Sequence, residues 1–78
     1  MKSFNIKLFG MLAEKLETSE FDFPYFETSI ELLNALKTEY PQLRTLNFTL
    51  AIDRQITHGN IELKGSEEIA LLPPFSGG

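Results

Sequence analysis

The residues whose types and order could do chemistry lie at the C-terminal end, in the sequence LLPPFSGG of residues 71–78. Proline has no N–H and a fixed φ, so Pro73 and Pro74 are expected to end a strand and to set the direction in which the chain leaves it. Glycine has no Cβ, so Gly77 and Gly78 form a thin tip. A thin tip on a stiff base suits insertion into a narrow channel of another protein.

The group that such a tip presents is the α-carboxylate of Gly78. A carboxylate is a poor acyl donor at neutral pH, and conversion to a mixed anhydride with AMP would activate it. If a sulfur nucleophile then displaces AMP, the product is a thiocarboxylate, which is ionised and reactive as a cysteine thiolate is. The sequence contains no cysteine, which excludes thiol chemistry and thiolate metal sites on its own side chains. We therefore expect Gly78 to be the reacting residue, with no bound metal or cofactor.

Residues 73–78 are expected to extend as an arm of about 20 Å, at roughly 3.3–3.6 Å per residue. Phe75 gives this arm one large apolar side chain, and Ser76 follows it. An apolar strip around Leu72 and Phe75 is predicted to anchor a partner protein. Two alternatives stay open, since Phe75 could fold back over its own core and a terminal Gly-Gly could be a frayed end.

Length and composition restrict the function classes. A chain of 78 residues forms one domain with a modest core, which favours a carrier, a binding module or a subunit over an enzyme with its own deep pocket. The net charge of −4 leaves no basic stripe for nucleic acid but could steer the protein toward a basic partner. No apolar run is long enough for a membrane span. The lack of cysteine and of a signal-peptide pattern predicts a cytoplasmic protein.

Alternation of apolar and polar residues predicts strands over residues 3–9, 20–23, 48–53 and 68–73. In the first strand, Phe4, Ile6 and Leu8 face one way, and Asn5, Lys7 and Phe9 face the other. Most of the seven phenylalanines are expected in the core. Residues 61–64 read as a short edge strand or a turn. Residues 11–19 read as a helical turn or a loop packed by Met11, Leu12 and Leu16.

One long helix is predicted in TSIELLNALKTEYPQL, residues 28–43. Thr28 and Glu31 have the spacing of a capping box at its start. Pro41 disfavours helical geometry at the residue before it, so the helix should end near Glu39. Its apolar side is expected to consist of Ile30, Leu32, Leu33, Leu36, Tyr40 and Leu43.

A single helix cannot cover both faces of a parallel sheet, but it can cover one face of a mixed sheet. The element order therefore predicts an α+β protein with a β-grasp (ubiquitin-like) domain over residues 1–72 and a functional tail over residues 73–78. In this fold the first and last strands are parallel neighbours, so the tail would leave from the centre of the sheet. A ferredoxin-like fold would need a second long helix.

The ending EEIALLPPFSGG resembles that of the small subunit of molybdopterin synthase, which closes with an apolar strand, two prolines and Gly-Gly. The resemblance continues in KLFGMLAEKLE, in the predicted helix and in LAIDRQIT, where it is shared with other ubiquitin-like sulfur carriers. Ala13 stands where the family often has arginine, which leaves any contact by that loop in question. The sequence GSE of residues 65–67 replaces the usual GDE.

The resemblance implies that the protein is not an enzyme on its own but the sulfur-donating subunit of a complex. A ubiquitin-activating-type enzyme would use ATP to adenylate Gly78, and a sulfurtransferase system would convert it to a thiocarboxylate. The large subunit of molybdopterin synthase, in a heterotetramer, would accept the tail. Sulfur would then pass to a pterin precursor to form the dithiolene of molybdopterin. Gly77 and Gly78 match the family's terminal motif, and residues 73–76 match its docking segment.

Other functions remain open. The protein could carry sulfur for thiamin or for tRNA thiolation, could be a ubiquitin-like modifier joined to lysines through Gly78, or could be an interaction module with an idle tail. His58, the only histidine, is expected in a solvated turn. Asp53 and Arg54 are expected to form a surface pair or to touch a partner. Glu67 and Glu68 are expected in a solvated turn or against basic residues of the activating enzyme.

Overall fold

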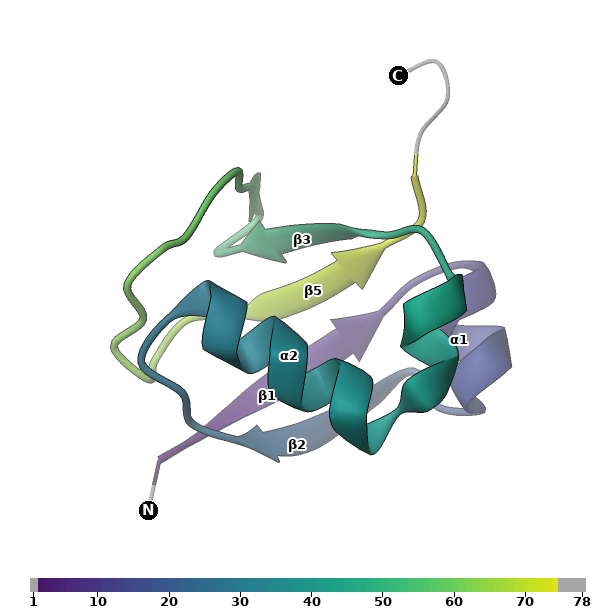
Figure 1. The fold of residues 1–78 in the computed structure, drawn as a ribbon, viewed down its shortest axis with the longest axis horizontal. Helices are drawn as coiled ribbons and strands as arrows, with labels where there is room; N and C mark the ends of the chain where they lie inside the picture. The colour runs from purple at the N-terminus through teal and green to yellow at the C-terminus, as the bar shows by residue number, and fades with distance from the viewer. Residues whose placement is uncertain (1, 75–78) are drawn as a thin grey trace.

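The structure is a computed structural model, and it describes residues 2–74 of the chain. The elements in chain order are β1 (Ser3–Leu8), α1 (Met11–Leu16), β2 (Glu20–Pro24), α2 (Ser29–Glu39), the 3₁₀ helix η1 (Pro41–Thr45), β3 (Thr49–Ile52), β4 (Gln55–Ile56) and β5 (Ile69–Leu72). Figure 1 shows α2 lying across one face of the sheet. This arrangement confirms the predicted α+β architecture of the β-grasp type.

The five strands form one mixed sheet in the order β2-β1-β5-β3-β4. β1 pairs antiparallel with β2, and β5 pairs antiparallel with β3. β1 and β5 run parallel, with Ile6 opposite Ile69 and Leu8 opposite Leu71. The prediction that the last strand lies in the centre of the sheet, beside the first, is therefore confirmed.

The core lies between the sheet and α2. The period-two alternation of the strands puts every second side chain on the helix side. The fully buried large side chains are those of Phe4, Ile6, Leu12, Leu32, Leu36, Leu43, Ile69 and Leu71. An aromatic contact closes one end of the core, where the Phe21 and Tyr40 ring centroids are 4.9 Å apart. These residues fix the central strands, and so fix where β5 ends.

The boundaries of α2 agree with the capping signals in the sequence. The Thr28 hydroxyl oxygen accepts a hydrogen bond from the Glu31 N–H at 3.3 Å, and the Thr28 hydroxyl donates to the Glu31 carboxylate at 3.2 Å. The helix ends at Glu39, as predicted, and η1 begins at Pro41. The reason is that the residue before a proline is disfavoured in helical geometry.

Two residues predicted to pack against the sheet are instead exposed. Ile30 is 48% exposed, because at 100° per residue it lies about 160° around the helix from the buried Leu32. Met11 is also 48% exposed, because α1 is a true helix in which Leu12 and Leu16, four residues apart, face the core. Both predictions were wrong for the same reason, since a short amphipathic helix buries a narrower stripe than its apolar content suggests.

The short strand lies earlier in the chain than predicted. β4 is Gln55–Ile56, which pairs with the end of β3 through a two-residue turn at Asp53 and Arg54. Residues 61–64 contribute only one isolated bridge, between Glu62 and Thr28. Asp53 and Arg54 both have positive φ, as the central residues of tight hairpin turns do. Neither position is a glycine, so no clear local signal indicated this turn.

Two further observations concern residues 2–74 as a whole. No helix in this range is long and apolar enough to cross a membrane. In the same range, no three histidine, cysteine or acidic side chains are grouped so that they could hold a metal ion.

Candidate functional site at the end of the last strand

The site begins where β5 stops pairing. On one side, the Phe9 N–H donates to the Leu71 carbonyl at 3.2 Å, and on the other side Leu72 lies opposite Thr49 of β3. β5 ends at Leu72, and Pro73, which has no N–H, follows directly. The chain therefore leaves the sheet at Pro73 from between its two neighbouring strands, as Figure 1 shows at the end of β5.

Gly10 fixes the first residue of the exit. Its backbone has φ +61° and ψ −137°, a conformation that residues with a side chain rarely adopt. A Cβ on Gly10 would lie 2.7 Å from the Cγ of Pro73, too close for any real carbon contact. The Pro73 ring thus packs directly on the main chain of the β1–α1 loop, and this contact holds the base of the tail.

An uncovered apolar surface lies beside this exit, on the side of the sheet away from α2. We call it the open sheet face, and it is formed by Phe9, Ala51, Ile56, Ala70 and Leu72. Phe9 and Ile56 are 47% and 49% exposed, and the hollow between the side chains has a volume of about 330 Å³. A surface of this kind is suited to contact another protein. It continues directly into the tail through Leu72.

Charged side chains line the rim of the open sheet face. The Glu68 carboxylate lies 3.2 Å from the Lys7 ammonium and 3.6 Å from the Arg54 guanidinium. The backbone N–H of Glu68 donates to the Asp53 carboxylate at 2.9 Å, so the turn and the start of β5 are tied together. Arg54 therefore pairs with Glu68 rather than with Asp53. Such pairs are exposed and contribute little to stability, but they set the charge pattern that a partner meets.

Glu67 has an internal role that the sequence did not reveal. Its carboxylate accepts hydrogen bonds from the N–H groups of Lys64 at 2.7 Å and of Gly65 at 2.8 Å. Partial burial alone would raise the pKa of Glu67, but these backbone donors stabilise the charged form and leave the pKa below its ordinary value of 4.5. Glu67 thus closes the turn that leads into β5, so it is not simply a solvated residue.

The predicted site residues divide into two groups. Leu72 is half-buried at the end of β5, Pro73 is half-buried against Gly10, and Pro74 is exposed. The other four, Phe75, Ser76, Gly77 and Gly78, lie outside the described residues. His58 is exposed in the bend before Gly59, as expected of a turn residue.

Two residues of the site were not predicted as such. Phe9 was predicted to face away from the core, on the same side as Asn5 and Lys7, and this prediction is confirmed. Its role in an exposed apolar surface was not predicted. The signal was present, because a phenylalanine on the polar side of an alternating strand needs a separate explanation. Gly10 directly follows the predicted strand of residues 3–9, and no sequence pattern could show that Pro73 would pack on it.

The family model described as the ThiS family matches residues 6–78. No curated protein matches the sequence.

The solved structures that are similar to this chain include two of one small archaeal protein. The solution structure of the small archaeal modifier protein 1 (SAMP1) from Methanosarcina acetivorans is 30% identical, with a TM-score of 0.80, and the match covers 100% of this chain and 98% of that one. The crystal structure of SAMP1 from Haloferax volcanii is 25% identical, with a TM-score of 0.79, and the match covers 97% of this chain and 99% of that one.

Proposed function

Because the chain belongs to the ThiS family of ubiquitin-like sulfur carriers, we propose that the C-terminal carboxylate of Gly78 is its reacting group. An activating enzyme joins this carboxylate to the AMP part of ATP and releases pyrophosphate. A sulfur nucleophile then attacks the acyl carbon, the bond to AMP breaks, and Gly78 becomes a thiocarboxylate. Residues 1–72 act as the part that partners recognise, and residues 73–78 act as the arm that enters their active sites.

The observation that carries this proposal is the release of the chain at Pro73. β5 is the central strand, held by β1 and β3 on its two sides, so its end is fixed in space. The contact of Pro73 with Gly10 then fixes the direction of the next residue. A tail with a rigid base loses less conformational freedom when it enters a channel than a tail with a flexible base.

The open sheet face supports the partner part of the proposal. Carriers of this family work with partner enzymes, and a partner bound on Phe9, Ile56 and Leu72 would lie next to the exit of the tail. The apolar hollow would supply the contact energy, and the charged rim at Glu68 and Arg54 would orient the partner. We propose that the activating enzyme uses this face.

We further propose that the final acceptor of sulfur is a pterin precursor, bound by the large subunit of molybdopterin synthase. The sequence of residues 67–78 supports this choice through its Pro-Pro-aromatic lead-in to Gly-Gly. Each carrier delivers one sulfur atom, so the dithiolene of molybdopterin requires two charged carriers. Sulfur transfer for thiamin or for tRNA would use the same activated Gly78 with a different acceptor.

A second candidate function is protein modification, and a specific observation favours it. The two solved structures described above are of SAMP1, a small archaeal modifier protein, and their matches extend over almost the whole of both chains. In this function a lysine amine attacks the activated carbonyl of Gly78, and an isopeptide bond forms in place of the bond to AMP. The two functions share the activation step and differ in the nucleophile.

The decisive experiment is the intact mass of the protein after incubation with ATP, a sulfur source and the cognate activating enzyme. We expect an increase equal to the mass difference between one sulfur and one oxygen atom. A chain without Gly78 should show no change and serves as the control. If the full-length protein also keeps its mass while the enzyme consumes ATP, the sulfur-carrier proposal is wrong.

The acceptor is tested separately. The thiocarboxylated protein is mixed with the large synthase subunit and the pterin precursor, and molybdopterin is measured. Formation of molybdopterin, with return of the carrier to its original mass, supports the pterin acceptor. A ladder of high-mass conjugates on cellular proteins, lost on deletion of Gly78, would instead assign the protein to the modifiers.

A further inference from the structure

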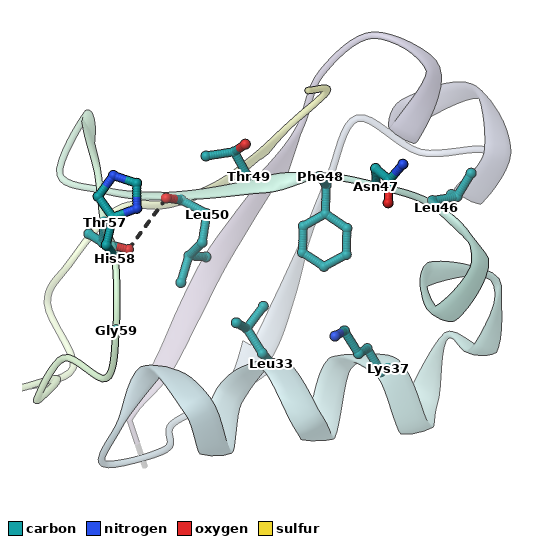
Figure 2. A pocket seen from close by; sticks show the side chains of 10 residues that line it. All are labelled: Leu33, Lys37, Leu46, Asn47, Phe48, Thr49, Leu50, Thr57, His58 and Gly59. Carbon is teal, nitrogen blue, oxygen red and sulfur yellow. Dashed lines mark hydrogen bonds between the residues drawn. The ribbon is translucent and has the colours of Figure 1, made fainter. Parts of the chain in front are cut away.

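Grooves lie on both sides of α2, and they differ in the strand that forms their second wall. The groove between α2 and β3 has a volume of about 500 Å³. Figure 2 shows the Thr57 hydroxyl bonded to the Leu50 carbonyl of β3 at this groove. The Thr57 N–H also donates to that carbonyl at 3.1 Å, and Gln55 pairs with Ile52. The outward backbone positions of β3 are therefore already taken.

The groove on the other side lies between α2 and β2, and we call it the β2 groove. Its volume is about 420 Å³. Phe23 and Phe26, whose ring centroids are 6.0 Å apart, line it on the side of β2, and Ala35 lines it on the side of α2. Figure 1 shows β2 at the edge of the sheet, where β1 is its only neighbouring strand within residues 2–74. This wall of the groove is therefore an edge strand.

The hydrogen bonds at the two ends of β2 show which of its backbone groups face β1. At one end, the Leu8 N–H donates to the Ser19 carbonyl at 2.9 Å. At the other end, the Tyr25 N–H donates to the Lys2 carbonyl at 3.3 Å. In an antiparallel pair, hydrogen-bonded positions alternate with positions that are not hydrogen-bonded to the neighbour. Both ends give the same alternation, in which the odd-numbered residues of β2 bond to β1.

The even-numbered residues of β2 are Glu20, Asp22 and Pro24, and their backbone groups point away from β1. The Thr18 hydroxyl occupies the Glu20 carbonyl at 2.9 Å. The Glu20 N–H, both backbone groups of Asp22 and the Pro24 carbonyl have no hydrogen-bond partner within residues 2–74. Free groups of this kind beside an apolar groove are what an added peptide strand requires. Pro24 has no N–H, so it sets where the pairing ends.

The side chains of β2 alternate between the two faces of the sheet. Phe21 and Phe23 pack against the core on the side of α2, whereas Glu20 and Asp22 are exposed on the other side. Side chains of an added strand share the face of the residues directly opposite them. Every second side chain of that strand would therefore enter the β2 groove, and the others would lie beside the two carboxylates.

The charge around β2 indicates a basic occupant. Glu39, which lines the β2 groove from α2, adds a third carboxylate. Lys2 lines the adjoining hollow with Asp22, but its ammonium donates to the Lys64 carbonyl at 3.0 Å. A second copy of β2 is unsuited, because a two-fold antiparallel pair centred on Asp22 would bring like carboxylates directly opposite each other. Charges and a proline on an edge strand act against self-association in this way.

We propose that the outer edge of β2 binds an extended segment of a partner protein in which apolar residues alternate with lysine or arginine. The segment bonds to the free backbone groups of Glu20, Asp22 and Pro24. Its apolar side chains enter the β2 groove, and its basic side chains lie beside the carboxylates of β2. The site is separate from the chemistry of Gly78, because β1 lies between β2 and the strand that carries the tail.

The test uses the full-length, ¹⁵N-labelled protein and three capped synthetic peptides. In one, valine alternates with lysine, and in the second, valine alternates with glutamate. The third has the composition of the first, with its valines and lysines in two separate blocks. Only the alternating lysine peptide should shift the amide signals of β2 and Ala35 saturably below about 1 mM.

Hydrogen exchange distinguishes strand addition from simple charge attraction. The alternating lysine peptide should slow exchange of the Glu20 and Asp22 amides, whose N–H groups point outward. Exchange of the Phe21 and Phe23 amides, which already bond to β1, should change little.

Asp22→Lys should reverse the preference, so that the glutamate peptide binds better than the lysine peptide, because the charge at the centre of the edge changes sign. Glu62→Lys makes the same change in net charge at an exposed position outside β2 and should keep the wild-type preference. A native amide spectrum checks that both variants are folded. Both should leave thiocarboxylation of Gly78 unchanged, so this proposal and the carrier function can fail independently.

Asp22→Pro tests the backbone bond itself. Proline is tolerated on an edge strand where the lost N–H faces solvent, so the pairing with β1 should remain. The variant should bind the alternating lysine peptide at least tenfold more weakly than the wild-type protein, through loss of the central N–H and of one carboxylate.

Several results would overturn the proposal. Equal binding of the alternating lysine and glutamate peptides would do so, as would equal binding of the alternating and block peptides. Shifts confined to the open sheet face, or no saturable shifts up to about 1 mM peptide, the weak limit of specific association, would also contradict it. If the β2 amides shift when the protein alone is concentrated, the occupant is a second copy and not a basic segment.

Discussion

Gly10 and Pro73 are in direct contact at the end of the sheet, where a Cβ on Gly10 would lie 2.7 Å from the Pro73 Cγ. The contact joins the loop after the first strand to the first residue after the last strand. Those two strands are parallel neighbours, so both segments leave the sheet at the same end. The exit of the tail is therefore built from residues at opposite ends of the chain.

Gly10→Ala should lower the free energy of unfolding by about 1–3 kcal/mol, because it adds both backbone strain and a collision with the Pro73 ring. The control is Gly59→Ala, where φ is +77° but nothing lies within 4 Å of the new Cβ, so only the backbone cost of about 1 kcal/mol remains. Chemical denaturation measures both. Equal losses in the two variants would show that the contact with Pro73 does not constrain the loop.

A double-mutant cycle isolates the contact itself. Pro73→Ala removes the Cγ that collides with the new methyl group, so it should restore part of the stability lost in Gly10→Ala. Strictly additive losses would contradict the contact.

Phe9→Asp should weaken binding of the activating enzyme at least tenfold, because it places a charge in the centre of the open sheet face. The matched control is Ile30→Asp, since the two side chains are 47% and 48% exposed but lie on opposite sides of the sheet. Both variants should keep the native amide spectrum. Affinity measured by calorimetry should therefore fall for the first and not for the second, and equal affinities would remove the open sheet face from the partner contact.

Glu67→Gln should lower the free energy of unfolding by about 1 kcal/mol at pH 7, because a charged acceptor is lost from the turn of Lys64 and Gly65. The folded pKa of Glu67 is lowered from 4.5, so its contribution is fully present above that value and is lost as the pH falls through the folded pKa. The wild-type and variant stabilities should thus converge below pH 4.5. The exposed Glu62 offers a control. Glu62→Gln should change the free energy of unfolding little, both at pH 7 and below pH 4.5.

Much of this fold could be predicted from local signals in the sequence. The alternation in residues 3–9 gave β1 to within one residue, and the capping pair Thr28 and Glu31 with Pro41 gave both ends of α2. These signals work because they depend on neighbours in the chain. The parallel pairing of β1 and β5 followed from the order of elements, since few topologies accommodate a single long helix.

The features that were missed depend on contacts between distant segments. The turn at Asp53 and Arg54 forms without glycine, and Glu68 ties it to β5 through bonds that no local pattern encodes. The position of Pro73 on Gly10 likewise exists only after β1 and β5 have paired. For the site, the sequence predicted that Pro73 and Pro74 would end the last strand, although its predicted range of 68–73 included Pro73, and the surface that adjoins this end required the structure.

The stiffness of the exit should matter for catalysis by the partner more than for stability. Replacing both Pro73 and Pro74 by alanine frees two backbone positions, which must be ordered again when the tail enters an active site. The conformational freedom that each proline removes from the free tail corresponds to about 0.4–1 kcal/mol. We therefore expect kcat/KM for adenylation to fall about tenfold in the double variant. Pro41→Ala, at the exposed start of η1, removes a proline far from the tail and should leave kcat/KM unchanged. If the double variant is adenylated as fast as Pro41→Ala, the prolines do not pre-organise the tail, and its docking must rest on the open sheet face alone.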